Sequence, residues 1–223
     1  MLILAADTSG KNGSLALVQF TDESSQVLEI VSLEGGNFSA QLVPQISGLL
    51  EKQKLAKSAI DGFAVASGPG SFTGLRVGLA AIKALAEILQ KPIVAVSLLE
   101  AVARAAGCEG NVLAVLDAGR GDVYCGEYQI RESCATLLSH QLLTAPEFAA
   151  GAAGRMVATP DARVADLARE SNSKVILTAP PRADTIARLG FEKIKAGEIV
   201  SPEALDAIYI RRTEPEIKKV VRP

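Results

Sequence analysis

Aromatic side chains are scarce in this sequence, which has no tryptophan, three tyrosines and six phenylalanines among 223 residues. A platform that stacks single-stranded nucleic acid bases needs aromatic rings, so the composition disfavours one. The net charge of −2 provides no overall basic field that would attract nucleic acid or a membrane surface. The body of the chain is therefore not expected to recognise nucleic acid through its general composition.

Histidine and cysteine are also rare. His140 is the only histidine, so no second imidazole can complete a zinc site, and it lies beside Ser139 without a nucleophile-elbow sequence. The cysteines are odd in number, show no CxxC spacing and are expected to be reduced thiols of a cytoplasmic protein: Cys108, Cys125 and Cys134. We therefore expect no metal site and no histidine-dependent hydrolase.

Long apolar runs are absent too. The longest apolar stretch is interrupted by Arg76, Lys83 and Glu87, so nothing approaches the ~18 apolar residues of a membrane span. The first seven residues are apolar but lack a basic segment, and they are expected to form a buried strand rather than a signal peptide. The sequence predicts a cytoplasmic protein without a membrane partner.

One stretch, residues 67–78 (SGPGSFTGLRVG), stands out among what is present. Its glycines and proline predict a tight turn, and Ser71 or Thr73 can cap a helix that runs to about Leu89. The polar residues of that helix share one narrow stripe: Arg76, Lys83, Glu87 and Gln90. A helix that is apolar nearly all round is buried on two sides, so a second helix, domain or chain must cover what the sheet does not.

The first hundred residues predict a mixed sheet flanked by helices. We expect strands over 2–6, 14–20, 27–33, 60–66 and 93–96, and helices over 39–53, 73–89 and 98–106. The apolar strand 112–119 then repeats 2–9 without a gap, and each is followed by a hairpin return. The sequence therefore predicts an α/β fold of two similar lobes, 1–106 and 107–223, with the second less regular.

The second lobe is expected to be less regular than the first. Beyond 112–119, its expected elements include strands over 123–130, 135–143, 156–158 and 175–177, and helices over 162–170 and 181–196. Ser201, Pro202 and Glu203 have the residue types of a helix start, with a cap followed by proline.

Both lobes carry an aspartate at the end of their first strand. In a bilobal nucleotide-binding fold, turns such as Asp7-Thr8-Ser9 and the turn at Asp117 hold phosphates and a metal ion or water. The alternative is that each aspartate only caps its own turn. Residues 67–78 could also cradle a phosphate at a helix N-terminus, but they lack the Gly-Lys-Ser/Thr ending of a Walker A loop.

Several of these motifs resemble the TsaB (YeaZ) family of tRNA threonylcarbamoyladenosine biosynthesis proteins. The most specific is 68–78 (GPGSFTGLRVG), supported by Asp7-Thr8-Ser9, by Asp117-Ala118 with Val123-Tyr124, and by Tyr209-Ile210-Arg211. The resemblance implies an actin-like ASKHA fold with two lobes. It also implies a non-catalytic, dimerising subunit that supports a catalytic TsaD-like paralogue in modifying the adenosine next to the tRNA anticodon.

The same resemblance sets expectations for partners. A TsaE-like ATPase would join the complex, a homodimer would form without the paralogue, and tRNA would be met only through the complex. TsaD-type proteins carry metal-binding histidines that this chain lacks, so no cofactor is expected. The chain departs from the family pattern at Phe38, where many relatives have histidine, at Gly119, where they have arginine, and at Ala207, where proline is common.

We therefore predict an interface on the helices 73–89 and 39–53. Gly74, Gly78 and Ala81 would let two backbones approach, so that the glycines leave space for a helix rather than a nucleotide. The buried contacts would come from Phe72, Leu75, Leu79, Ile82, Leu42 and Ile46. Gly78→Arg or Leu79→Asp would then abolish association and leave the chain folded.

Two alternatives remain open at this stage. The chain could be an ATP-using ASKHA enzyme of the small-molecule kinase type, with ATP or ADP and Mg²⁺ held by Asp7, Thr8, Ser9 and Asp117. It could also bind tRNA directly through its basic end, where a solvated tail is the competing interpretation: Arg211, Arg212, Lys218, Lys219 and Arg222.

Overall fold

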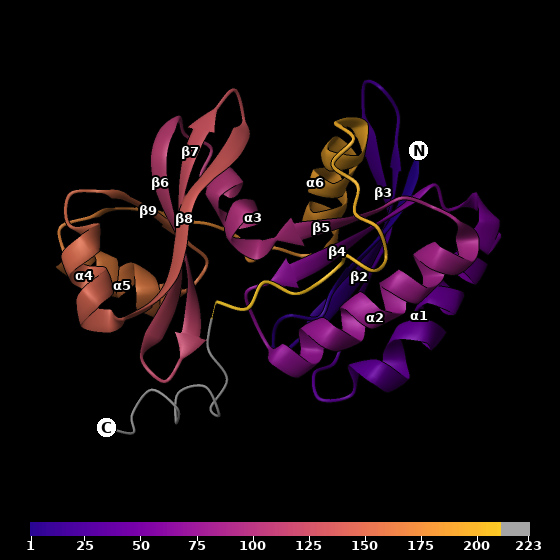
Figure 1. Ribbon diagram of the computed structural model, residues 1–223, viewed down its shortest axis with the longest axis horizontal. Helices are drawn as coiled ribbons and strands as arrows, with labels where there is room; N and C mark the ends of the chain where they lie inside the picture. The colour runs from indigo at the N-terminus through magenta and orange to yellow at the C-terminus, as the bar shows by residue number, and fades with distance from the viewer. Residues whose placement is uncertain (211–223) are drawn as a thin grey trace. The chain divides into compact units, whose positions relative to one another are not determined.

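A computed structural model of the chain describes residues 1–210. The chain divides into two compact units (Figure 1). The first holds Met1–Ala101 and Pro180–Ala207, and the second holds Val102–Ala179 and, of the described residues, 208–210. The sequence predicts one boundary, after residue 106. In the structure the segment Pro180–Ala207 also belongs to the first unit, which is the main difference.

The first unit is built on a five-stranded mixed sheet with the order β3-β2-β1-β4-β5. Its strands are β1 (Leu2–Asp7), β2 (Gly13–Phe20), β3 (Ser25–Leu33), β4 (Gly62–Gly68) and β5 (Ile93–Ser97). The first three form an antiparallel meander, while β4 and β5 run parallel to β1. Every residue of β1 and β4 is buried, as expected for strands with helices on both faces of the sheet.

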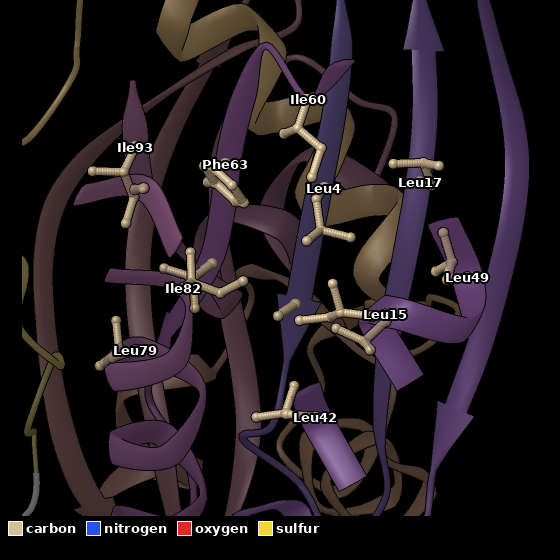
Figure 2. Packing of buried hydrophobic residues seen from close by; sticks show 14 of the residues in the cluster. Leu4, Leu15, Leu17, Leu42, Leu49, Ile60, Phe63, Leu79, Ile82 and Ile93 are labelled. Atoms are coloured by element: carbon tan, nitrogen blue, oxygen red, sulfur yellow. The ribbon is translucent and has the colours of Figure 1, made fainter. Parts of the chain in front are cut away.

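Three helices cover this sheet (Figure 1). Helices α1 (Phe38–Lys52) and α2 (Phe72–Leu89) lie against one face, where Phe63 and Leu4 belong to the same apolar core as Leu42 and Ile82 (Figure 2). Helix α6 (Ala183–Lys195) packs against the other face of the sheet. A side chain at Gly190 of this helix would meet Ala64 of β4. Ala64 follows Phe63 in the strand, so its side chain points to the face opposite to that of Phe63.

Two contacts explain why α6 belongs to the first unit. The N–H of Ala183, at the start of the helix, donates to the Ser14 hydroxyl of β2 at 2.9 Å. The Phe191 ring stacks on Phe20 with centroids 4.4 Å apart. The sequence predicts the helix from its periodicity, but periodicity does not indicate which sheet a helix covers.

The second unit repeats the plan of the first. Its strands are β6 (Gly110–Gly119), β7 (Asp122–Arg131), β8 (Cys134–Thr144), β9 (Met156–Thr159) and β10 (Lys174–Leu177). Their order is β8-β7-β6-β9-β10, with two antiparallel pairs followed by two parallel pairs, as in the first sheet. The expected α/β fold of two lobes with mixed sheets and flanking helices is confirmed.

The helices of the second unit are shorter. Helix α4 (Ala145–Ala152) has 8 residues where its counterpart α1 has 15, and α5 (Ala162–Glu170) has 9 where α2 has 18. Phe148 of α4 and Val164 of α5 fill the core of this unit against β6 and β7. Helix α3 (Leu98–Ala105) follows β5 and contains the division between the units.

Two local expectations differ from the structure. Helix α4 was not predicted, although Thr144 and Glu147 form a capping box with Pro146 in the first turn. Conversely, residues 201–204 form only a turn, in which the N–H groups of Ala204 and Leu205 both bond to the Ser201 carbonyl. A good cap begins a helix only when tertiary packing supports the turns that follow.

Among residues 1–210, no helix is both long enough and apolar enough to cross a membrane.

Candidate functional site

The turn that precedes α2 is fastened to the turn that follows β1. The Ser71 hydroxyl caps the helix by accepting the Gly74 N–H at 3.3 Å, and the Ser71 N–H donates to the Ser9 carbonyl at 2.7 Å. A Cβ at Gly70 would lie 2.6 Å from that same carbonyl. The motif at residues 67–78 therefore serves first to dock the start of α2 onto the central strand.

Thr8 occupies the space beside the glycines of α2. Its buried hydroxyl donates to the Gly74 carbonyl at 2.7 Å. A Cβ at Gly74 would collide with the Thr8 carbonyl oxygen, and one at Gly78 would collide with the Thr8 hydroxyl. These two glycines therefore admit the β1 turn of the same unit, and the expectation that they leave space for a partner helix is corrected.

Most of the residues expected at an interface lie inside the core of the first unit. Buried together there are Leu75, Leu79, Ile82, Leu42 and Ile46. They pack where α1 and α2 meet the sheet, as Figure 2 shows for Leu42, Leu79 and Ile82. Helical spacing identified the apolar residues, but it could not tell the sheet-facing side from the outward side.

This placement changes the expected effect of two substitutions. An arginine at Gly78 would have to displace Thr8, and an aspartate at Leu79 would place a charge in the core. Both changes would therefore disrupt the fold rather than leave a folded chain that has lost only its partner. Of the nine expected interface residues, Phe72 is exposed and Ala81 is half-buried.

The outward side of the two helices carries a different apolar set. Its largest side chains are Val43, Phe72 and Ile88, which are 58%, 42% and 73% exposed. Small residues are exposed on the same two helices: Gly48, Ala80 and Ala84. We call Val43, Gly48, Phe72, Ala80, Ala84 and Ile88 the α1/α2 outer face.

Gly48 has an unusual position in this outer face. It lies inside α1, and a Cβ at this position would meet no atom of a neighbouring element within 4 Å, so nothing within the unit requires a glycine there. A glycine in a helix interior costs about 1 kcal/mol relative to alanine. From Phe38 to Leu50 the helix also carries no charged residue. These features fit a surface that another helix can approach closely.

The turn after β1 uses its polar groups internally. One carboxylate oxygen of Asp7, Oδ1, accepts the Ser9 N–H at 2.9 Å and the Ser9 hydroxyl at 2.6 Å. Burial raises the pKa of Asp7, and the two hydrogen bonds from Ser9 only partly oppose that rise. A phosphate at this turn would meet a buried carboxylate, and the Ser9 N–H is already engaged.

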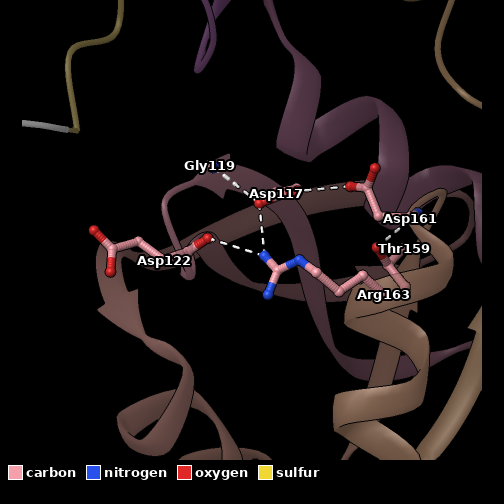
Figure 3. Close-up of polar contacts among 6 residues, drawn as sticks. All are labelled: Asp117, Gly119, Asp122, Thr159, Asp161 and Arg163. Atoms are coloured by element: carbon pink, nitrogen blue, oxygen red, sulfur yellow. Dashed lines mark hydrogen bonds and ion pairs between the residues drawn. The ribbon is translucent and has the colours of Figure 1, made fainter.

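The equivalent turn in the second unit has the same local form (Figure 3). Asp117 Oδ1 accepts the Gly119 N–H at 2.8 Å, as Asp7 accepts that of Ser9. The Asp117 carboxylate also forms an ion pair with Arg163 Nη2 at 2.6 Å. Partial burial raises the pKa of Asp117, but the hydrogen bonds from Arg163 and Gly119 outweigh it and lower the pKa.

Arg163 holds the second turn closed and was not predicted from the sequence. Its Nη2 also donates to the Asp122 carbonyl at 3.3 Å, which ties both ends of the β6–β7 turn to α5 (Figure 3). The Asp117 N–H in turn donates to Asp161, the N-cap residue of α5, at 2.9 Å. The sequence shows only that Arg163 lies in the first turn of a helix whose N-cap residue is Asp161. Many helices have such a pair of residues, so the pattern does not indicate an ion pair with Asp117.

The remaining expected reactive groups lie apart from these turns. His140 is exposed on β8, Cys134 is exposed, Cys108 is half-buried and Cys125 is buried. Burial raises the pKa of the Cys125 thiol to about 11. It lines a small pocket on the second sheet together with the ion-paired Glu127 and Arg155. The basic residues from Arg211 onward lie outside the described part of the chain.

Comparison with known proteins gives these features a context. The family model described as "TsaD: tRNA N6-adenosine threonylcarbamoyltransferase" matches residues 32–176, more than half of the chain. The TsaB protein of Bacillus subtilis is 37% identical over 132 residues, which are 59% of this chain and 56% of that protein. TsaB of Escherichia coli is 32% identical over 136 residues, covering 60% and 57% of the two chains. The matched region thus spans just over half the length of these curated relatives.

Two solved structures from Pseudomonas aeruginosa are similar over nearly the whole chain. One, titled YeaZ, has a TM-score of 0.71 and 27% identity over 93% of this chain and 99% of its own. The other, described as an uncharacterized protein with similarity to peptidase YeaZ, has a TM-score of 0.72 and 29% identity over 94% and 99%. With its repeated sheet order and these matches, the chain belongs to the TsaD-type threonylcarbamoyltransferase family and, within it, to the TsaB (YeaZ) proteins.

Proposed function

We propose that this chain is the non-catalytic, dimerising subunit of a tRNA threonylcarbamoyladenosine-forming complex. It supports a catalytic TsaD-like paralogue that modifies the adenosine next to the anticodon. The observation that carries this proposal is the α1/α2 outer face, where α1 carries no charge from Phe38 to Leu50 and where Val43, Phe72 and Ile88 are exposed. Large apolar side chains left exposed on a pair of packed helices are typical of a protein interface.

The occupant of this face is a partner with the same fold. Helices α1 and α2 pack beside each other, so two copies of the pair can form a four-helix bundle (Figure 1). The small side chains at Gly48, Ala80 and Ala84 let the backbones of such a bundle come close. A TsaD-like paralogue offers the homologous pair of helices, and a second copy of this chain offers the same pair in its absence.

The two strand-end turns do not support the alternative of an ATP-using enzyme. Asp7 and Ser9 bond to each other, and Asp117 is held by Arg163. Each turn is thus stabilised by groups of its own unit. In the proposed complex the chemistry belongs to the paralogue, a TsaE-like ATPase joins it, and this chain meets tRNA only through the assembly, in the cytoplasm.

Co-elution with a TsaD-like paralogue tests the proposal. The variant Val43→Asp/Ile88→Asp places two charges on the α1/α2 outer face, where each would be buried without a partner in a complex. It is expected to elute separately from the paralogue in size-exclusion chromatography with light scattering, while the wild-type chain co-elutes at the mass of the complex.

A matched control separates a lost interface from a general effect of added charge. Leu177 lies on β10 and is 58% exposed, as is Val43, so Leu177→Asp adds charge at an equally open site. This control is expected to co-elute as the wild type does. Co-elution of the double variant at wild-type affinity would refute the interface, and so would separation of both variants.

A further inference from the structure

Among residues 1–210, β8 forms an open sheet edge, whereas the other three sheet edges are protected. A free edge strand exposes unpaired N–H and C=O groups, and natural proteins protect such edges by charge, by shortness or by covering segments. The four edge strands here are β3, β5, β8 and β10. A comparison of the four identifies β8 as the exception.

Three of the edges are protected. On β3, the Gln53 side chain donates to the Leu28 carbonyl at 3.3 Å, and Glu29 pairs with Lys52 at 2.7 Å. On β5, the N–H of Val200, which follows α6 in the sequence, bonds to the Ile93 carbonyl at 3.0 Å. The segment after α6 thus covers this edge at Ile93. The fourth edge strand, β10, is only 4 residues long and begins with Lys174.

In the described part of the chain, β8 has none of these protections. It is 11 residues long and contains no proline, Lys, Arg, Asp or Glu (CATLLSHQLLT). Residues 136–141 are all exposed, including Leu137 at 45% and Leu138 at 51%. Within residues 1–210, β8 pairs with β7 alone, and its one further backbone bond is from the Thr144 N–H to Glu147.

The pairing of β8 with β7 is irregular at one point. A bulge at Leu138 interrupts the pairing with β7, because Glu127 pairs with Ser139 and Tyr128 with Leu137. The strand from Ser139 to Leu143 remains regular, which leaves a straight outer edge of 5 residues.

We propose that β8 is a second association site, where the outer edges of β8 from two copies of this chain pair antiparallel. The two five-stranded sheets then join into one continuous sheet. This site is distinct from the α1/α2 outer face, which lies on the other unit, and it does not depend on the proposed function.

The absence of charge indicates which partner fits this edge. In an antiparallel pair of identical strands, residues near the centre face their own copies, so any charge there would meet a like charge. The strand avoids that repulsion by carrying no acidic or basic residue apart from His140. A strand that recognised a different peptide would be free to carry charges complementary to it. The composition therefore fits a second copy of the chain.

The association is expected to be weak. Pairing along about five residues buries much less than the roughly 800 Å² per partner of a standard interface. The dimer should therefore depend on concentration.

Charge-swap variants at His140 test the proposal. His140 is exposed and lies opposite Gly126 on β7, so a charge there has no cross-strand side chain within its own sheet. The full chain carries Val43→Asp/Ile88→Asp as background, and sedimentation velocity is measured over a range of concentrations. The background chain is expected to form dimers. Addition of His140→Lys or His140→Glu should weaken them about fivefold, and an equimolar mixture of the two should restore them.

Two further measurements keep the test decisive. Gln26→Lys on the covered edge strand β3 is the matched control and should leave the dimer unchanged. In the wild-type chain, hydrogen exchange should slow as concentration rises at those amides of 139–143 that point away from β7. A monomer at every concentration would overturn the proposal. Protection of these outward amides at every concentration would also overturn it, since another segment of the same chain would then cover the edge.

Discussion

The Thr8 hydroxyl at the end of β1 donates a hydrogen bond to the Gly74 carbonyl in the first turn of α2, at 2.7 Å. The same hydroxyl fills the space that a side chain at Gly78 would need. One buried residue of the turn after the central strand thus sets how closely α2 approaches the sheet. This contact explains why the side of α2 that carries its glycines faces inward and why the proposed partner-facing side is the opposite one.

The two helix glycines are predicted to respond in opposite directions to alanine. Gly78→Ala forces a methyl group against Thr8 and should lower the free energy of unfolding by ~1–3 kcal/mol. Gly48→Ala meets open space and should raise it by ~0.5–1 kcal/mol, because alanine favours the helix. Urea denaturation of the two variants measures both. Equal destabilisation by both would contradict the assignment of the inward and outward sides.

Asp7 is predicted to make stability depend on pH. Burial raises the pKa of its carboxyl above the ordinary value of 3.8, so folding favours the protonated form. The stabilising effect of that proton is present below the ordinary pKa and is lost as pH rises through the raised value. Asp7→Asn keeps an oxygen that can accept both Ser9 hydrogen bonds but cannot ionise. The variant should be more stable than wild type at pH 7, with a difference that shrinks on acidification.

A companion variant sharpens the test of Asp7. The Ser9 hydroxyl bonds to the carboxylate at 2.6 Å and lowers the pKa of Asp7. Ser9→Ala removes this bond, so the pKa of Asp7 should be higher in the variant. The fall in stability with rising pH should then extend to a higher pH in the variant than in wild type. Thermal unfolding from pH 3 to 8 gives the comparison, and a stability difference between wild type and Asp7→Asn that stays constant across this range would count against the account.

The three cysteines are predicted to react in order of their exposure. Cys134 is exposed and should be alkylated first in the native chain, while Cys125 should react only after unfolding. Burial raises the pKa of Cys125 to about 11, which leaves almost no thiolate at neutral pH. Mass spectrometry after timed labelling with iodoacetamide gives the order. Cys134→Ser should remove the fast phase, and early modification of Cys125 would contradict the burial of that thiol.

The sequence predicted the architecture better than it predicted the surfaces. The repeat of an apolar strand, an aspartate and a hairpin was enough to predict two similar lobes, because buried strands have a strong hydrophobic signature. The side of α2 that meets the sheet was not predictable, since Leu75 and Ile88 are equally apolar. What separates them is the position of Thr8, a contact between residues that are far apart in the sequence.

Two other features depend on long-range contacts in the same way. The return of α6 to the first sheet rests on Ser14 and on the stack between Phe20 and Phe191. The ion pair of Arg163 with Asp117 joins residues from different elements of the second unit. By contrast, the missed helix α4 has a local signal, the capping residues Thr144 and Glu147.

The central claim is that this chain acts by association through the α1/α2 outer face and performs no chemistry at Asp7. The most direct measurement is the amount of threonylcarbamoyladenosine formed on tRNA by a reconstituted TsaD-like paralogue with TsaE-like ATPase. Wild type and Asp7→Asn should support formation to within about twofold of each other, whereas Val43→Asp/Ile88→Asp should reduce it to the level seen when the chain is omitted. Loss of formation with Asp7→Asn, together with full formation by the double variant, would contradict the account.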